Sequence, residues 1–107
     1  MAESGAGERT AALHIAADHP AFAGHFPGHP VLPGVALLAE VLELAWADPH
    51  WAARLGDPAR IAAVKFLAPV LPDATLTVTF SGAAGALRFE VFEGARLAAS
   101  GAFEAPA

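Results

Sequence analysis

Cysteine is absent from this sequence of 107 residues, so disulfide bonds and thiolate chemistry are excluded. Basic residues are scarce: six lysines and arginines stand against eleven aspartates and glutamates, and the formal net charge is −5. Arg54, Arg60 and Lys65 are the only basic residues close together in sequence, a spacing typical of scattered solubilising charges. We therefore expect no nucleic-acid partner.

Long, uniformly apolar runs are also missing. The first ten residues, MAESGAGERT, contain Glu3 and Glu8 and lack the apolar core of a signal peptide. No later run is long and uniformly apolar enough to cross a bilayer. These absences predict a soluble cytoplasmic protein that does not enter a membrane.

Apolar bulk, by contrast, is abundant: hydrophobic residues make up 55% of the chain and charged residues 16%. This composition supports a single packed domain, which we place at residues 9–107, after a flexible tail at residues 1–8. Much of the apolar content is alanine, which buries little area per residue. Because such a core gains stability by covering a face with a second subunit, we expect an oligomer.

The hydrophobic pattern predicts one helix near the middle of the chain. Residues 9–16 alternate weakly, as a strand does, and residues 17–33 hold too many prolines and glycines for regular structure. Residues 34–47 combine strong helix formers with apolar side chains on nearly every face, which is typical of a buried helix. Residues 50–56 add a short helical turn.

The second half of the chain alternates as strands do. Expected strands, separated by proline or glycine breaks, lie at residues 61–67, 75–81, 87–92 and 96–103. One buried helix followed by antiparallel strands predicts an α+β domain in which a sheet wraps around a central helix.

The most informative stretch runs from Phe22 to Val35 and reads F-A-G-H-F-P-G-H-P-V-L-P-G-V. It resembles the site segment of FabA/FabZ-type 3-hydroxyacyl-acyl-carrier-protein dehydratases, including their aryl-polyene-pathway relatives. A second block, V-K-F-L-A-P-V-L-P-D at residues 64–73, and the closing hairpin extend the likeness to about residues 10–104. The resemblance implies a hot-dog fold, with two such domains joined through their sheets and acyl tunnels at the interface.

The chemistry of this stretch can be understood from its residues. Dehydration of a 3-hydroxyacyl thioester needs a base for the α-proton, a donor to the thioester carbonyl and an acid for the leaving hydroxyl. An imidazole, whose unperturbed pKa is about 6.5, can act as that base near neutral pH. A free amide at a helix start favours developing negative charge on a carbonyl oxygen. The resemblance assigns these roles to His25 as catalytic base and to the Gly34 amide as carbonyl donor.

The residues around His25 and Gly34 are the candidates for substrate contact. For the apolar residues among them, ordinary packing in the core is an equally good explanation. These candidates are Phe26, Pro27, Pro30, Val31, Leu32, Pro33, Val35 and Leu38.

The remaining histidines are expected to have other roles. For His14, His19 and His50 we expect packing or capping, and for His29 a loop position near the mouth of the site. No pair has the spacing of a metal site, so no metal is expected. No redox cofactor is expected either, because the thioester itself acidifies the α-proton.

The sequence departs from the family at the acid. The family places a carboxylate on the buried helix where this chain has Ala39. Glu40 follows, turned by about 100° around the helix, and Glu43 lies on the face of Ala39 roughly 6 Å further along the axis. Three explanations stay open: Glu40 serves as the catalytic acid after a one-residue shift, a partner subunit supplies the carboxylate, or dehydration has been lost.

The leading interpretation is therefore an enzyme, a hydro-lyase that converts a 3-hydroxyacyl thioester to the trans-2-enoyl thioester in fatty-acid or polyene synthesis. The expected partners are an acyl-carrier-protein or coenzyme A thioester and a second subunit, in a homodimer or in a heterodimer with a paralogue. The alternatives are a hot-dog acyl thioesterase and a catalytically silent subunit of a heterodimeric dehydratase.

Overall fold

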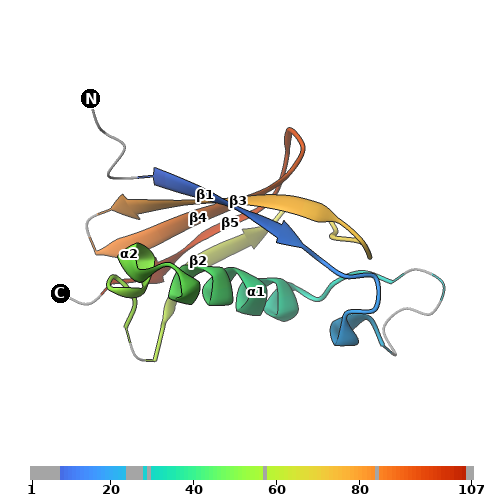
Figure 1. Ribbon diagram of the computed structural model, residues 1–107, viewed down its shortest axis with the longest axis horizontal. Coiled ribbons are helices and arrows are strands. Elements are labelled where there is room, and N and C mark those ends of the chain that lie inside the picture. The colour runs from blue at the N-terminus through green and yellow to red at the C-terminus, as the bar shows by residue number, and fades with distance from the viewer. Residues whose placement is uncertain (1–7, 24–27, 29, 57, 84, 106–107) are drawn as a thin grey trace.

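The computed structural model describes residues 8–23, 28, 30–56, 58–83 and 85–105. Within these ranges the chain forms five strands, two α-helices and one 3-10 helix (Figure 1). In chain order they are β1 Glu8–His14, η1 Pro20–Phe22, α1 Gly34–Ala47, α2 Pro49–Ala52, β2 Ile61–Phe66, β3 Thr75–Ala83, β4 Ala86–Glu93 and β5 Arg96–Glu104.

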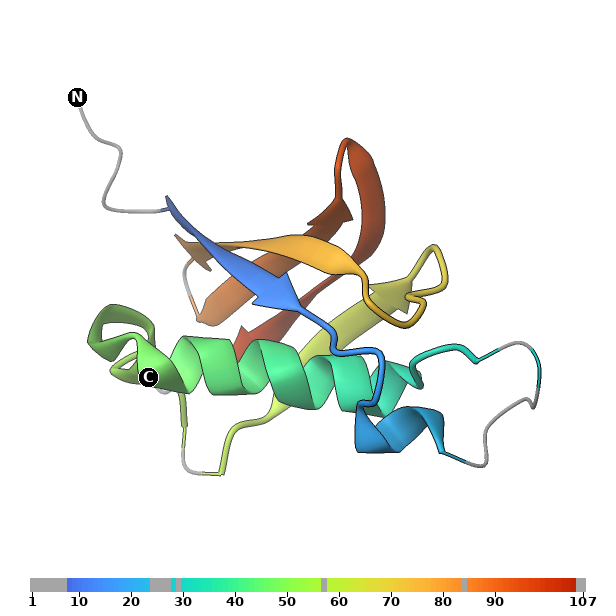
Figure 2. The same ribbon diagram turned by 45° about the vertical axis from the view of Figure 1, so that its right-hand side comes forward.

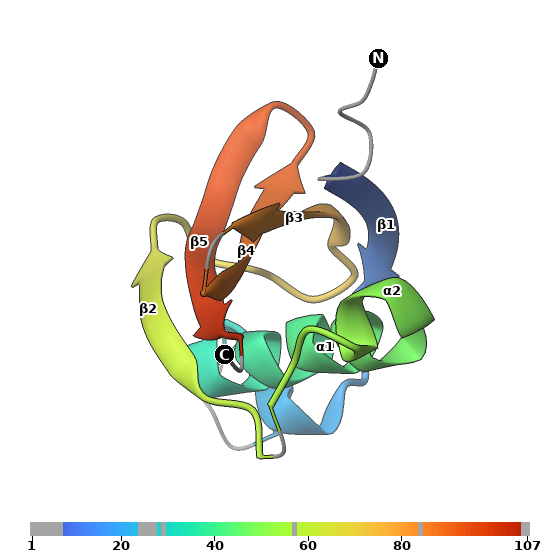
Figure 3. The same ribbon diagram turned by 90° about the vertical axis from the view of Figure 1, so that its left-hand side faces the viewer.

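The five strands form one antiparallel sheet in the order β1-β3-β4-β5-β2. Figure 3 looks along the helix and shows the sheet curving over α1, from β1 on one side to β2 on the other. The strands β1 and β2 are the two edges of the sheet. In sequence, β2 comes directly after α2 and before β3, but in the sheet it pairs with β5. The predicted α+β class, an antiparallel sheet wrapped around one long helix, is confirmed.

The strands form where the sequence alternates. In β3 the residues Leu76, Val78 and Phe80 are buried, whereas the threonines between them are exposed or half-buried. Because successive side chains of a strand point to opposite faces, this alternation gives the sheet one apolar face and one polar face. The β4–β5 turn begins at Gly94, whose φ of +60° is readily adopted by glycine.

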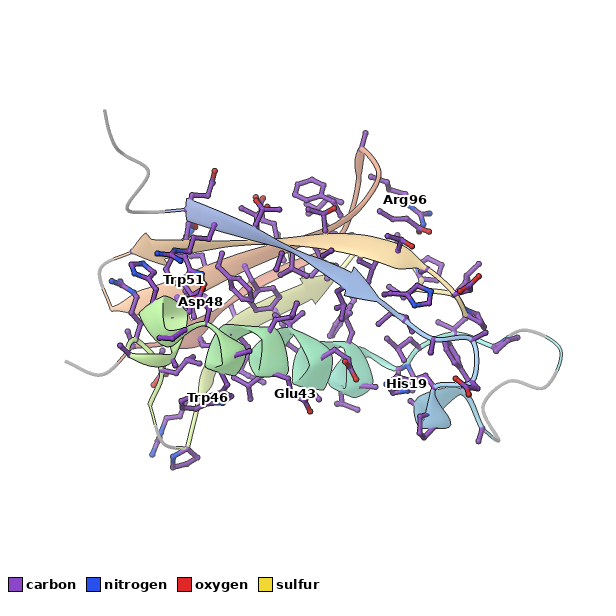
Figure 4. All side chains as sticks on the ribbon, viewed as in Figure 1. His19, Glu43, Trp46, Asp48, Trp51 and Arg96 are labelled. Atoms are coloured by element: carbon purple, nitrogen blue, oxygen red, sulfur yellow. The ribbon has the colours of Figure 1, made fainter. Side chains whose placement is uncertain are left out.

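Helix α1 begins and ends at the predicted residues, but the prediction that it is buried on nearly every side is wrong. Its side toward the sheet carries Leu37, Val41 and Ala45, which are buried. On the opposite side Val35 is 78% exposed and Trp46 42% exposed. A single sheet covers only one side of the helix, and Trp46 in Figure 4 points away from it.

The segment between β1 and α1 also differs from the prediction, since it contains a turn of 3-10 helix where only loop was expected. Pro20 opens η1, and the His19 side chain accepts a hydrogen bond from the amide of Ala21. A local side chain to backbone hydrogen bond of this kind stabilises a short turn that periodicity does not predict. None of the helices in the described ranges is long and apolar enough to cross a membrane.

Gly101 is a position where β5 needs the absence of a side chain. A Cβ atom there would collide with the carbonyl oxygen of Ala63 in β2 and lie 2.8 Å from Cζ of Phe89 in β4. The neighbouring strands therefore approach Gly101 more closely than any other residue would allow.

We predict that Gly101→Ala lowers the free energy of unfolding by about 1–3 kcal/mol, because overpacking forces the neighbouring backbone to shift. Urea unfolding measures the change, and Ser100→Ala, the adjacent and half-buried position, is the control. A Gly101→Ala protein as stable as the control would contradict the close packing of β2 on β5.

Candidate functional site

The first backbone amides of α1 have no hydrogen-bond partner within the part of the chain that the structure describes. Pro33 is the N-cap residue and makes no side-chain capping hydrogen bond. The first bonded amides are those of Ala36 and Leu37, which donate to the carbonyl oxygen of Pro33 at 3.0 and 3.1 Å. The amides of Gly34 and Val35 precede this turn, so they are available to a ligand at the positive end of the helix dipole.

A cleft of about 380 Å³ opens beside this helix end. It lies between the segment that leads into α1 and the segment that leaves β2, and is lined by Val31, Leu32, Gly34, Leu37 and residues 66–70. The lining side chains are apolar throughout. An apolar cleft next to free amides suits a ligand with a hydrocarbon part and a carbonyl oxygen.

Phe66 closes the cleft over the first residue of α1. A Cβ atom on Gly34 would lie 2.7 Å from Cε2 and Cζ of the Phe66 ring, so the ring rests against the glycine backbone. Phe66 is also 50% exposed, so the ring is only partly covered by the rest of the domain. Gly34 therefore serves two purposes, since it permits this contact and supplies one of the free amides.

A second hollow of about 370 Å³ lies next to the first and shares Val31 with it. Its other lining residues are Gly28, Pro30, Leu71 and Pro72. Gly28 has a φ of +85°, a backbone conformation that glycine adopts at no steric cost. The two hollows together extend along the segment that carries the predicted motif.

Apart from Glu40, the sequence-predicted site residues divide into three groups. His25, Phe26 and Pro27 lie outside the described residues. Val31, Leu32, Gly34 and Pro30 line the two hollows, whereas Pro33, Val35 and Leu38 line neither.

The other wall of the cleft was not predicted from the sequence. Leu37 and the segment 66–70 line it, and this whole segment lies within the block V-K-F-L-A-P-V that forms part of the resemblance. The missing information was spatial, because this block begins at Val64 and the motif stretch ends at Val35, far apart in sequence.

Of the two candidate acids, Glu43 shares the exposed side of α1 with Ala39, the position that the family uses, whereas Glu40 lies on a different side. Ala39 is exposed, on the same side as Val35 and Trp46, and Glu43 is exposed too. Figure 4 shows Glu43 pointing away from the sheet. Glu40 is instead turned toward η1, where its Oε2 lies 2.9 Å from Nε2 of His19. The catalytic role of Glu40 stays a prediction.

Of the other histidines, His19 has the capping role expected of it, since it caps η1 through Nδ1. His14 on β1 was expected to pack or cap but is exposed, with 2.7 Å between its Nε2 and Oδ1 of Asp73. His29 lies outside the described residues. His50 packs edge-on against Trp51. Among the described residues, no group of three or more histidine, aspartate or glutamate side chains is placed to hold a metal ion.

The chain matches the ApeI-like family, described as ApeI dehydratase, over residues 2–102. It is 32% identical over 78 residues to the 3-hydroxyacyl-acyl-carrier-protein dehydratase FabZ of Syntrophomonas wolfei, an alignment that covers 68% of this chain and 54% of the relative. The corresponding FabZ of Myxococcus xanthus is 40% identical over 70 residues, covering 59% and 45%. The chain thus spans about half the length of these curated relatives.

Two solved structures have a similar fold. A chain of the dehydratase heterocomplex ApeI:P from Xenorhabdus doucetiae superimposes with a TM-score of 0.75 at 27% identity, covering 92% of this chain and 86% of that one. A protein from Erwinia carotovora subsp. atroseptica superimposes with a TM-score of 0.69 at 31% identity, covering 91% and 81%. Both similarities extend across the sheet and helix that build the cleft.

Proposed function

This chain belongs to the ApeI-like dehydratase family, and on that basis we propose that it removes water from a 3-hydroxyacyl thioester. The observation that carries the proposal is the free amide end of α1, which opens onto an apolar cleft directly after the G-H-F-P-G-H-P-V-L-P-G motif. The curated relatives are named for the acyl-carrier-protein form of this substrate, so we propose the same carrier here.

In the proposed reaction His25 takes the proton from the α-carbon of the acyl group. The electron pair moves toward the thioester carbonyl, whose oxygen gains negative charge and accepts a hydrogen bond from the Gly34 amide. The bond between the 3-carbon and its hydroxyl then breaks, and the hydroxyl leaves as water after receiving a proton. The product is the trans-2-enoyl thioester, and no oxidant or reductant is consumed.

We propose that a second chain donates the proton to the leaving hydroxyl. Glu40 supports this assignment indirectly, because its Oε2 is already hydrogen-bonded to His19 of the same chain and is turned away from the exposed side of α1. The position that carries the acid in the resembling family is Ala39, which has no proton to give. A partner with a carboxylate near this site would complete the chemistry.

We propose that β2 forms the interface between the two chains. This strand is an edge of the sheet, and all its residues except Val64 are exposed, among them Ile61 at 51% and Phe66 at 50%. An apolar edge strand offers unpaired backbone groups to another strand. The similar ApeI:P structure is a heterocomplex, which supports a paralogue as the partner.

The direct test is dehydration of a short 3-hydroxyacyl thioester, followed by the absorbance of the enoyl product. We expect turnover by the chain, alone or mixed with a carboxylate-bearing paralogue, and a loss of at least about 100-fold with His25→Ala because general base catalysis contributes 10²–10⁴-fold. Absence of turnover in both preparations would overturn the proposed function.

A pair of substitutions at Gly34 tests the amide. Gly34→Pro removes the N–H, and proline suits the first position of a helix after a residue in the extended conformation of Pro33, at φ −60° and ψ 146°. Gly34→Ala adds the same Cβ but keeps the N–H. We predict that kcat of the proline variant is about 100-fold below that of the alanine variant, with similar urea unfolding. Equal kcat values would exclude the amide as the carbonyl donor.

Matched substitutions on the two edge strands test which strand forms the subunit interface. Ala62 on β2 and Ala12 on β1 are both exposed alanines. We predict that Ala62→Asp shifts the assembly toward monomer in sedimentation velocity, because a charge on a pairing edge opposes strand addition, whereas Ala12→Asp leaves it unchanged. Dissociation with Ala12→Asp but not with Ala62→Asp would instead place the subunit interface at β1.

A further inference from the structure

The segment that carries the site motif is attached to the rest of the domain at both of its ends. At the end next to α1, the amide of Leu32 donates to the carbonyl oxygen of Val70 at 2.8 Å. At the end next to β1, Nε2 of His19 lies 2.9 Å from Oε2 of Glu40 on α1. The first attachment is made by backbone atoms, and the second by two side chains.

The His19 ring has a defined tautomer in this arrangement. The amide of Ala21 donates to Nδ1 at 3.0 Å, so Nδ1 carries no proton. The hydrogen is therefore on Nε2, which donates to Glu40. Both ring nitrogens are occupied, and the side chains of His19 and Glu40 are only 20% and 31% exposed.

The pair also connects η1 to the helix that supplies the amide. Figure 2 shows η1 beside the N-terminal half of α1. Glu40 follows Gly34 by six residues on α1, which is about 9 Å along the helix axis at a rise of about 1.5 Å per residue. On η1, the ring of Phe22 meets that of His19 edge-on, with 6.2 Å between their centroids, and packs against the core.

We infer that the hydrogen bond between His19 and Glu40 is a positioning pair for the dehydration site, an assignment that rests on the function proposed above. The pair holds η1, which precedes the motif, at a fixed place on α1, six residues from Gly34, whose amide is the proposed carbonyl donor. Misplacement of reacting groups by 1 Å can cost about 100-fold in rate. Glu40 thus acts through geometry and not by transferring a proton to substrate.

A second histidine–carboxylate pair of the chain provides the control. His14 and Asp73 lie 2.7 Å apart, but their side chains are 54% and 74% exposed, and the pair joins β1 to the turn before β3. It has the same chemistry without any attachment to α1. Loss of either pair removes one hydrogen bond, which is worth about 1 kcal/mol of stability, so the variants are expected to fold.

The test compares kcat and KM for His19→Ala, Glu40→Ala, the double variant, Glu40→Gln and His14→Ala. We expect kcat to fall about tenfold in both single alanine variants, no further in the double variant, and KM to change less than threefold. Glu40→Gln keeps an oxygen that accepts from Nε2 and restores most of the turnover. His14→Ala matches the unmodified chain.

Two kinetic results would overturn the assignment. If Glu40→Gln loses as much turnover as Glu40→Ala, the carboxylate itself takes part in proton transfer. If His19→Ala and Glu40→Ala match His14→Ala in kcat, the pair contributes only to stability.

A measurement independent of turnover tests the attachment itself. We expect amide exchange of residues 21–23 to speed up in Glu40→Ala but not in Glu40→Gln or His14→Ala, and the ¹⁵N shifts of the His19 ring to report the Nε2–H tautomer. If the unmodified chain has no turnover either alone or with the paralogue, the proposed function fails, while this measurement still decides whether the pair holds the segment. Unchanged exchange in Glu40→Ala would refute the inference.

Discussion

The packing of one side of α1 against the curved sheet is the interaction on which the rest of this structure depends. Leu37, Val41 and Ala45 are buried there against side chains of the inner face of the sheet, such as Phe80 and Phe89. Because residues three and four apart share a helix face, this burial fixes both the rotation of α1 and the position of its first residue. Every feature of the candidate site is arranged around that helix end.

Because the rotation of α1 is fixed, its other residues face different parts of the molecule. Gly34 faces the ring of Phe66 and the cleft, Glu40 faces η1, and Ala39 faces outward with Val35 and Trp46. One helix therefore supplies an amide to the cleft and a carboxylate to η1, and its exposed side carries an apolar surface that includes Val35 and Trp46. These directions follow from the rotation of about 100° per residue along the helix. Inserting or deleting one residue would therefore turn each of these side chains toward different surroundings.

Several parts of the fold could be predicted from the sequence because their signals are local. The alternation of T-L-T-V-T-F-S predicts β3, and proline followed by an uninterrupted run of helix formers predicts the start of α1. The η1 turn was missed because a hydrogen bond from Ala21 to His19 stabilises it in a stretch rich in proline. The exposure of Val35 was missed as well, since composition does not indicate how far a sheet extends around a helix.

By itself, the sequence determined the strands, the long helix, the motif that includes His25 and Gly34, and the absence of a carboxylate at Ala39. These are properties of residue type and short-range spacing, which are readable without coordinates. Only the tertiary structure decided that Phe66 rests on Gly34 and that His19 donates to Glu40. Both contacts join residues twenty or more positions apart, and such contacts depend on the strand order and on the rotation of α1, which no local pattern encodes.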